Sequence, residues 1–459
     1  GATEACNVIA QAQSYRSMRA AQSFSNALDS ACLGSFWANW NDTKYNFAGD
    51  ATKLYRMQSA SWSSVGTGYT SATAWDFLKF RDRVIALSHN DAPQYFDMGT
   101  SSNFAALPGS PPTARYGAVV RDFVVLGHLS TDPDKIIWSG FNNSEKWTES
   151  PITLSSSRVM RGRAGNVQRI VPGQYGVVFT EHSIFRMDLL TDNRVFNLRE
   201  AEPNSGTPAP WSVAWEGSEV YYYGHDGFYL FNGEVSTPIG VNRVDRWFRS
   251  QVDETAFDRV RAVVDRHNHL VMWSFPTPGS TINNRLLIFN KGSNRWSYAK
   301  VDAEVIAEYA PEGYNIDTLD TVLPGGIDAN DFSVDSTAYL GQLINLLVFD
   351  SSHKAATLSG DALPGMIETR EMGSGTRARL FCNNVRPLVE GSGASVTVSV
   401  GVRERTNDNY TYGLPVTQNA IGECNVRTAG RFMRARVNTT GHFDHAAGVQ
   451  ANVRLQGVR

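Results

Sequence analysis

A short couplet, an aliphatic or aromatic residue followed by an aromatic one, recurs seven times and constrains the fold more than any other feature. In each copy a strand-like run ends in the couplet, a polar turn follows, and a second run often carries Trp or another large apolar residue. Counted from the second residue of each couplet, the steps are 41, 42, 47, 46, 58 and 60 residues. The couplets are Leu54-Tyr55, Tyr95-Phe96, Ile137-Trp138, Ile184-Phe185, Leu230-Phe231, Ile288-Phe289 and Val348-Phe349.

This spacing predicts a β-propeller. A four-stranded blade needs roughly 40 to 50 residues, so each step corresponds to one blade. A twisted sheet cannot bury both of its faces alone, and radial packing against neighbouring sheets solves that problem. We therefore predict an all-β fold with a propeller of about seven blades, in which each of the two long steps holds an insertion of about 15 residues. Six or eight blades, or a pair of ordinary β-sandwiches, remain alternatives.

The rest of the chain divides around this repeat. Runs of four to seven residues rich in aromatic and β-branched types are separated by Gly, Asn and Ser, which is typical of strands and turns. Residues 243–261 predict one or two short helical turns. We expect an extended N-terminal segment over residues 1–30, the propeller over 31–360 and a separate β domain over 361–459.

The last hundred residues differ in charge and pattern. Residues 361–459 contain 12 Arg, no Lys and 8 acidic residues, which is a formal +4, so the preceding part carries about −7. Polar and apolar residues alternate over 395–400 and 431–437, which predicts a small antiparallel β-sandwich or barrel with one covered face. Arg431, Arg434 and Arg436 are the candidate surface for docking on a neighbouring ring, because arginine favours fixed, planar contacts. The alternative is a solvated face whose arginines pair along the strands.

An acidic stretch precedes that domain. Residues 301–353 contain ten acidic residues and no Lys or Arg, and Pro-Gly-Gly at 324–326 marks a long excursion from the propeller. We predict an acidic insertion at about 301–345, an exposed loop or a loop that faces a channel and repels DNA. The candidate residues for such a lumen or gating loop are Asp317, Asp320, Asp328 and Asp331.

Sequence motifs for catalysis are absent. The chain has no phosphate-binding GxxxxGK[ST] loop, no HExxH zinc motif, no GxSxG elbow and no sialidase Asp-box. His267 and His269 share one face if they lie on a strand, but a turn explains them better than a metal site. Asp226-Gly227 is typical of a hairpin turn. We expect no enzymatic activity, no cofactor and no metal.

Charge and cysteine usage set further bounds. A formal charge of −3 argues against a nucleic-acid coat, which needs a basic surface, but it allows a neutral or acidic conduit through which DNA passes. The four cysteines have no metal-binding spacing, and a disulfide between Cys382 and Cys424 is left open. No run approaches the ~20 apolar residues of a spanning helix, so we expect no membrane span.

A series of short strings, made of turn and blade residues, extends over most of the chain. The strings are Gly1-Ala2…Ala5-Cys6-Asn7-Val8, Phe47-Ala48-Gly49-Asp50…Leu54-Tyr55, Ile137-Trp138-Ser139-Gly140-Phe141-Asn142…Trp147-Thr148, Gly224-His225-Asp226-Gly227-Phe228-Tyr229, Thr237-Pro238-Ile239-Gly240…Val244-Asp245-Arg246-Trp247-Phe248, Arg295-Trp296-Ser297, Gly365-Met366-Ile367-Glu368-Thr369, Gly430-Arg431-Phe432 and Gly457-Val458-Arg459. In their residues and their order, these strings resemble the tail nozzle or tail hub proteins of short-tailed bacteriophages, also called packaged-DNA stabilisation or tail tubular proteins.

The resemblance implies a structural virion protein. It implies a propeller core and a homo-oligomeric ring, commonly of six copies, below the portal and its adaptor. Such a ring is assembled in the host cytoplasm, contacts the adaptor and other tail proteins, and lets double-stranded DNA pass during ejection. The main alternative is a glycan-binding or receptor-binding propeller in which Tyr221–Tyr223 or Trp37 and Trp40 stack on sugars. A glycoside hydrolase is the third.

Overall fold

Strands dominate a computed structural model of the protein, which describes residues 2–160, 162–190, 195–311, 344–373, 378–391 and 393–456. The all-β class predicted from the sequence is thereby confirmed. Two compact units divide the chain: unit 1 contains residues 1–20, 286–301 and 358–459, and unit 2 contains residues 21–285 and 302–357.

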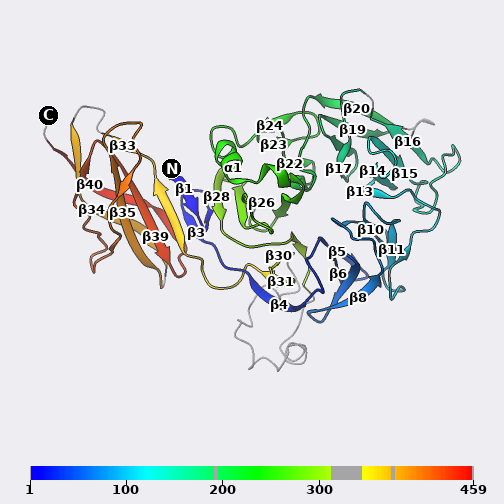
Figure 1. Cartoon of the computed structure of the whole chain (residues 1–459), viewed down its shortest axis with the longest axis horizontal. Helices are drawn as coiled ribbons and strands as arrows, with labels where there is room; N and C mark the ends of the chain where they lie inside the picture. Colours follow the sequence, from blue (N-terminus) through cyan, green and yellow to red (C-terminus); the bar gives the residue numbers. More distant parts are fainter. Residues whose placement is uncertain are drawn as a thin grey trace. The chain divides into compact units, whose positions relative to one another are not determined.

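Unit 2 consists mainly of small sheets. Six four-stranded sheets occur within its described residues, and Figure 1 shows them side by side around a centre, in a propeller-like arrangement. Five of them are formed by consecutive strands. The first sheet contains β5 (Gly34–Trp40), β6 (Thr43–Gly49), β7 (Lys53–Gln58) and β8 (Ser61–Thr67), the second contains β9 (Asp76–Phe80), β10 (Arg83–Leu87), β11 (Gln94–Asp97) and β12 (Ala105–Ala106), and the third contains β13 (Ala114–Val120), β14 (Phe123–Leu129), β15 (Lys135–Trp138) and β16 (Ser156–Val159). The fourth contains β17 (Val167–Val171), β18 (Gly176–Thr180), β19 (Ser183–Leu189) and β20 (Phe196–Pro203), and the fifth contains β21 (Ala214–Glu216), β22 (Glu219–Tyr223), β23 (Phe228–Phe231) and β24 (Ser236–Pro238).

The sixth sheet joins the two ends of unit 2. Its order is β29 (Ile306–Tyr309), β30 (Asn345–Phe349), β31 (Lys354–Thr357) and β4 (Gln22–Ala27). The first strand of the unit therefore pairs antiparallel with the last one, with Ser23 opposite Ala356. This pairing removes two free strand edges that would otherwise be open to association.

Unit 2 also contains its few helical turns and one further hairpin. The hairpin is β25 (Arg261–Asp265) with β26 (Leu270–Phe275). The 3-10 turn η1 (Pro210–Ser212) precedes β21, and α1 (Asp245–Gln251) and η2 (Glu254–Arg259) lie between β24 and β25. The helical turns predicted over 243–261 are confirmed, and they account for the extra length of the step from Phe231 to Phe289.

The first strands of successive sheets contact one another. Strand β29 contacts β5, β5 contacts β9, β9 contacts β13, and β13 contacts β17. The turn η1 contacts both β17 and β25, and β25 contacts β29. These contacts return to their starting strand, so the first strands surround a common centre.

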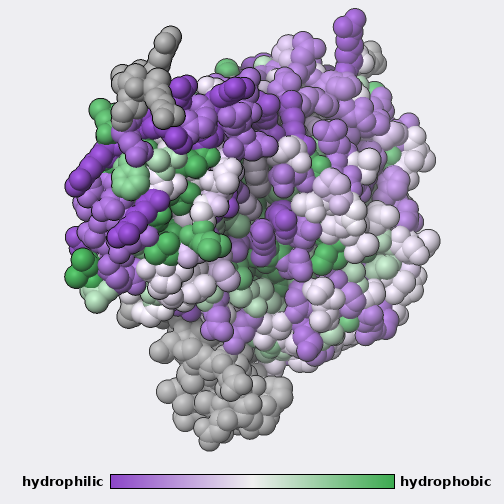
Figure 2. Space-filling model, turned by 60° about the vertical axis from the view of Figure 1, so that its left-hand side comes forward, coloured by the Kyte–Doolittle hydropathy of each residue, from purple (hydrophilic) through white to green (hydrophobic). Residues whose placement is uncertain are grey.

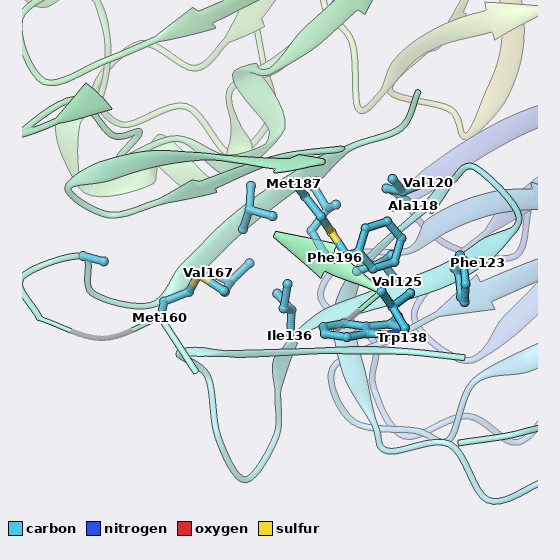
Figure 3. Packing of buried hydrophobic residues seen from close by; sticks show 14 residues of the cluster. Ala118, Val120, Phe123, Val125, Ile136, Trp138, Met160, Val167, Met187 and Phe196 are labelled. Carbon is cyan, nitrogen blue, oxygen red and sulfur yellow. The ribbon is translucent and has the colours of Figure 1, made fainter. Parts of the chain in front are cut away.

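Hydrophobic side chains seal each sheet against its neighbour. Figure 3 shows one such cluster, in which Phe123 and Trp138 of the β13–β16 sheet meet Val167, Met187 and Phe196 of the β17–β20 sheet. The Phe196 ring lies edge-on to both Phe123 and Trp138, with ring centroids 5.1 and 5.4 Å apart. Burying each large apolar side chain contributes about 1.5–3 kcal/mol. Comparable clusters lie between the other neighbouring sheets of the unit.

The couplets occupy the same place in five sheets. They lie on the third strands β7, β11, β15, β19 and β23, as a repeat of one blade per step requires. The seventh couplet, Val348-Phe349, lies instead on β30, the second strand of its sheet. The repeat also predicts a strand at Glu145-Lys146-Trp147-Thr148, after the couplet Ile137-Trp138. This prediction is wrong, because Trp147 lies in a loop that precedes β16 and is buried in the neighbouring core.

One of the strings has a clear packing role. A Cβ on Gly49 would lie 2.4 Å from the Trp75 ring. The Trp75 indole donates a hydrogen bond of 2.7 Å to the Asp50 carbonyl, and the Tyr55 hydroxyl donates one of 2.7 Å to the Asp50 carboxylate. Any side chain at position 49 would displace the indole, so this string holds β6, β7 and the start of β9 together.

Unit 1 consists of two sheets over one core. One runs β27 (Arg285–Asn290), β28 (Arg295–Ala299), β1 (Ala2–Cys6), β32 (Gly365–Thr369), β39 (Phe432–Thr440), β35 (Ser395–Arg403) and β36 (Thr411–Tyr412), with β33 (Met372–Gly373) and β37 (Val416–Thr417) at its side. The other runs β2 (Val8–Ala10), β3 (Tyr15–Ser17), β40 (His445–Gln456), β34 (Arg379–Glu390) and β38 (Thr428–Gly430). Alternate residues such as Val398 and Met433 face Val385 across the shared core, as the polar-apolar alternation predicts.

The division of the chain differs from the predicted one. Residues 2–17 are not a separate extended segment, because they form β1–β3 in the two sheets of unit 1. Residues 286–301 also belong to unit 1. Cys382 and Cys424 share the core of this unit as free thiols, not as a disulfide.

Candidate functional site

The arginines proposed for docking lie on or beside β39, and two of them serve a buried carboxylate. The Glu368 side chain is 5% exposed and pairs with Arg434 and Arg436, each at 3.0 Å. The Tyr412 hydroxyl donates a further hydrogen bond of 2.5 Å to the same carboxylate. Burial disfavours the charged form of Glu368, but the hydrogen bonds from Tyr412, Arg434 and Arg436 outweigh it and lower the pKa of the carboxyl.

Aromatic rings complete this cluster. The guanidinium of Arg436 lies 3.8 Å from the centre of the Tyr412 ring, and that of Arg434 lies 4.5 Å from the Tyr410 ring. The guanidinium groups of both arginines are therefore engaged inside the unit. Pairing along the strands, which the sequence left open as an alternative, is what the structure shows for these two residues.

Arg431 is placed differently. Its side chain is 44% exposed, and its closest carboxylate, that of Glu404, is 3.9 Å away. A contact of this kind at an exposed site contributes little. Of the three candidate docking residues, Arg431 is the one whose guanidinium is available to a partner.

The acidic candidates Asp317, Asp320, Asp328 and Asp331 lie outside the described residues. Flanking parts of the same acidic stretch are described. Glu304 is buried, accepts a 2.8 Å hydrogen bond from the Cys32 amide and contacts Nδ1 of His353 at 2.6 Å. This carboxylate therefore supports the sheet formed by β29–β31 and β4.

The histidines and the turn considered for chemistry have structural positions. His267 and His269 lie in the turn between β25 and β26. Gly227, with φ of +150°, ends the turn between β22 and β23, where a Cβ would lie 2.3 Å from the Asp245 carboxyl. No group of three or more His, Cys, Asp or Glu side chains suited to a metal occurs among the residues that the structure describes.

The strongest candidate site is a cavity at the centre of unit 2. It has a volume of about 230 Å³ and is lined by the first strands β5, β9, β21, β25 and β29 and by Arg169 of β17. We call it the axial cavity. A second cavity, of about 320 Å³, lies in the same unit. It shares Trp211 and Arg261 with the axial cavity, and its other lining residues are different.

Three arginines and two carboxylates line the axial cavity. Arg169 pairs with Asp76 at 2.9 Å, and Arg266 pairs with Glu308 at 3.4 Å. Arg261 has no ion pair within the described part of the chain, and its Nη2 donates a hydrogen bond of 2.7 Å to the Leu33 carbonyl. One positive charge of the cavity is therefore left without an opposite charge.

Trp211 lies beside the Arg261 guanidinium. The guanidinium carbons of Arg169 and Arg261 lie 4.7 and 4.8 Å from the centre of its ring, which are cation-π distances. Tyr116 packs edge-on against the same ring at 5.4 Å. The indole Nε1 of Trp211, the Tyr116 hydroxyl and Nε of Arg169 are buried and have no hydrogen-bond partner among the described residues.

Comparison with known proteins assigns no family. Neither a protein-family model nor a curated protein matches the chain. Among solved structures, the chain is similar to the computationally designed Ika8 protein, with 8% sequence identity and a TM-score of 0.39 over 74% of this chain and 99% of that one. A likeness of that size carries no functional argument.

The surface gives no single dominant feature in the view of Figure 2. Hydrophilic and hydrophobic residues are interspersed over the face shown there.

The aromatic residues considered for sugar stacking have structural positions. The run Tyr221–Tyr223 is buried in β22, and the Trp37 indole donates a hydrogen bond of 3.1 Å to Glu308 at the axial cavity. Among the described helices, none is long and apolar enough to cross a membrane.

Sequence reasoning missed the axial cavity. Asp76, Arg169, Trp211 and Arg261 lie on four separate segments of the chain, and no local motif joins them. The available signal was weak: Asp76 and Arg261 lie at the starts of β9 and β25, which are first strands of the repeat. First strands of a radial arrangement face its centre, so polar residues on them are candidates for an axial site.

Proposed function

We propose that the chain is a structural protein of a phage tail, in which several copies form a ring that surrounds the path of double-stranded DNA. The proposal rests on the order of the strings that resemble tail nozzle proteins, and the fold is compatible with it. The ring of contacts among the first strands of unit 2 is the structural observation that carries it, because such a unit is a rigid spacer.

The proposal includes a closed propeller of seven blades. The six four-stranded sheets supply six blades, and the β25–β26 hairpin would begin the seventh. Pairing of β4 with β31 supports closure, because it ties the beginning of unit 2 to its end in one blade. In closed radial folds this arrangement leaves only short, protected edges.

The DNA path would lie between copies, not within one of them. An axial cavity of about 230 Å³ is far too small for a duplex. A ring of identical chains needs a head-to-tail interface whose rotation closes on itself. Residues 1–360 carry a formal charge of about −7, which suits a conduit that must not hold DNA.

The oligomeric state of the full chain tests the proposal. Light scattering after size-exclusion chromatography, followed by negative-stain microscopy, should find rings, with six copies expected. Purified virions of a phage that encodes the chain should contain it in the tail. A monomer at all concentrations that binds a glycan on an array would instead favour the receptor-binding alternative, and turnover of a polysaccharide would favour a hydrolase.

A further inference from the structure

We propose that the axial cavity of unit 2 binds a small oxyanion, a carboxylate, phosphate or sulfate, through the Arg261 guanidinium beside the Trp211 indole. This inference is independent of the tail function proposed above. It would give the unit a ligand site that the repeat by itself does not reveal.

The charge balance is the first argument. In the axial cavity each carboxylate already has an arginine, Asp76 with Arg169 and Glu308 with Arg266, which leaves Arg261 unpaired. The second cavity is lined by Arg115 and Arg259 and by Asp258 and Glu304, besides Arg261. The other arginines and carboxylates are equal in number in both cavities, so Arg261 is the one arginine in excess in each.

Burial makes this charge costly. It lowers the pKa of Arg261 to about 10, and the nearby charge of Arg169 acts in the same direction. Cys32, Asp76 and Asp258 act in the opposite direction but do not offset the burial. A buried charge without a partner is unfavourable, because the protein interior replaces its hydration poorly. An anion beside Arg261 would offset that cost and would relieve its repulsion from Arg169.

Unused donors are the second, independent observation. Trp211 is 7% exposed and Arg169 9% exposed, both line the cavity, and Nε1 of Trp211 and Nε of Arg169 have no partner among the described residues. Buried N–H groups in native proteins nearly always have an acceptor. A ligand that only accepts hydrogen bonds fits a site with this surplus of donors.

The size and the donors define the ligand class. A volume of about 230 Å³ admits a small molecule and excludes a polymer. A guanidinium presents its donors in a planar fork that matches carboxylate and phosphate oxygens. Carboxylate, phosphate and sulfate share this chemistry, and comparing their affinities identifies the preferred one.

Titration of the full chain with acetate, phosphate and sulfate, each against chloride at equal ionic strength, tests the site. We expect saturable heat in calorimetry for at least one oxyanion and a rise in Tm of about 2 °C near saturation. A crystal soaked in selenate should show its anomalous peak within contact of Arg261. The absence of saturable binding to the wild-type chain, or a selenate peak only elsewhere, would overturn the proposal.

Two substitutions identify the residue responsible. Arg261→Gln should abolish the saturable heat and the rise in Tm. Arg266→Gln is the matched control, since Arg266 lines the same cavity but already pairs with Glu308, and it should keep the binding. Equal loss in both variants would indicate a general charge effect and would also overturn the proposal. If Arg261→Gln does not fold, the titration and the anomalous map of the wild-type chain decide the question.

Discussion

Ala27 of β4 lies directly opposite Lys354 of β31, so the two ends of unit 2 meet in one sheet although 326 residues separate them in the chain. The next residue, Leu28, is 3% exposed, and its amide donates a 3.0 Å hydrogen bond to the His353 carbonyl. The closing strand is thus held by backbone pairing and by a buried side chain. Its contribution to stability can be measured.

Leu28→Ala should weaken this closure. Removing a buried leucine side chain costs about 2–5 kcal/mol, through lost burial and a residual cavity. We expect faster hydrogen exchange in β4 and β31 and a lower urea midpoint for unit 2. Leu414→Ala is the control, since Leu414 is 88% exposed and its truncation should change stability by less than about 0.5 kcal/mol. Unchanged exchange in β31 would contradict the closing role of β4.

Glu368 should make unit 1 sensitive to acid. The folded state lowers the pKa of its carboxyl below the ordinary value of 4.5, so the stabilisation is complete above pH 4.5 and is lost as pH falls through the folded-state pKa. Glu368→Gln should lower the free energy of unfolding by about 2 kcal/mol at pH 7. This loss is smaller than that expected for a fully buried ion pair, because Arg434 and Arg436 are partly exposed.

The free energy of unfolding should depend less on pH in Glu368→Gln than in the wild type. Urea denaturation of the wild type and of Glu368→Gln between pH 3 and pH 7 measures both effects, and their difference in unfolding free energy should shrink toward low pH. Glu404→Gln is the control, because the Glu404 side chain is 47% exposed. A constant difference across this range would show that ionisation of Glu368 is not linked to folding.

Docking through the Arg-rich end of the chain should depend on Arg431. If the proposed tail function holds, Arg431→Glu should block tail assembly while the purified chain stays folded, since only an exposed contact with Glu404 is lost. Arg454→Glu, the same charge change at an exposed position on β40, should leave assembly intact. Electron microscopy of the resulting particles measures the outcome, and normal tails with Arg431→Glu would contradict the docking surface.

Arg434 and Arg436 are poor choices for that experiment. Reversing either charge would place an acidic side chain against buried Glu368, which should unfold the cluster and not only the interface. Circular dichroism melting of Arg434→Glu should therefore show a large loss of Tm, in contrast to Arg431→Glu. Equal Tm values for the two variants would contradict the assigned pairing.

Cys382 and Cys424 should be reduced and protected. Both are buried in the core of unit 1, and burial raises the pKa of Cys382 to about 11, so little thiolate forms at neutral pH. Alkylation without reductant should label neither residue in the native chain and both after denaturation, as read by peptide mass spectrometry. A disulfide-linked peptide containing the two residues would contradict this expectation.

Local features of the fold were predictable. Alternation over 431–437 anticipated that Met433, Ala435 and Val437 face the core, and Asp226-Gly227 anticipated a hairpin turn. The couplets located the third strands of five sheets because burial on both faces of a central strand demands large apolar residues at fixed places. Trp147 misled the prediction, since a buried indole in a long loop has the same local pattern as one in a strand.

By itself the sequence determined the all-β class, the repeat of small sheets and the alternating strands near the end, because these depend on interactions between residues close together in the chain. Only the tertiary structure decided that β4 pairs with β31, that β1–β3 join the sheets of unit 1, and that Arg261 meets Trp211 in the axial cavity. These contacts join segments far apart in the chain, so their formation depends on the packing of whole sheets. No local pattern of residue types records that packing.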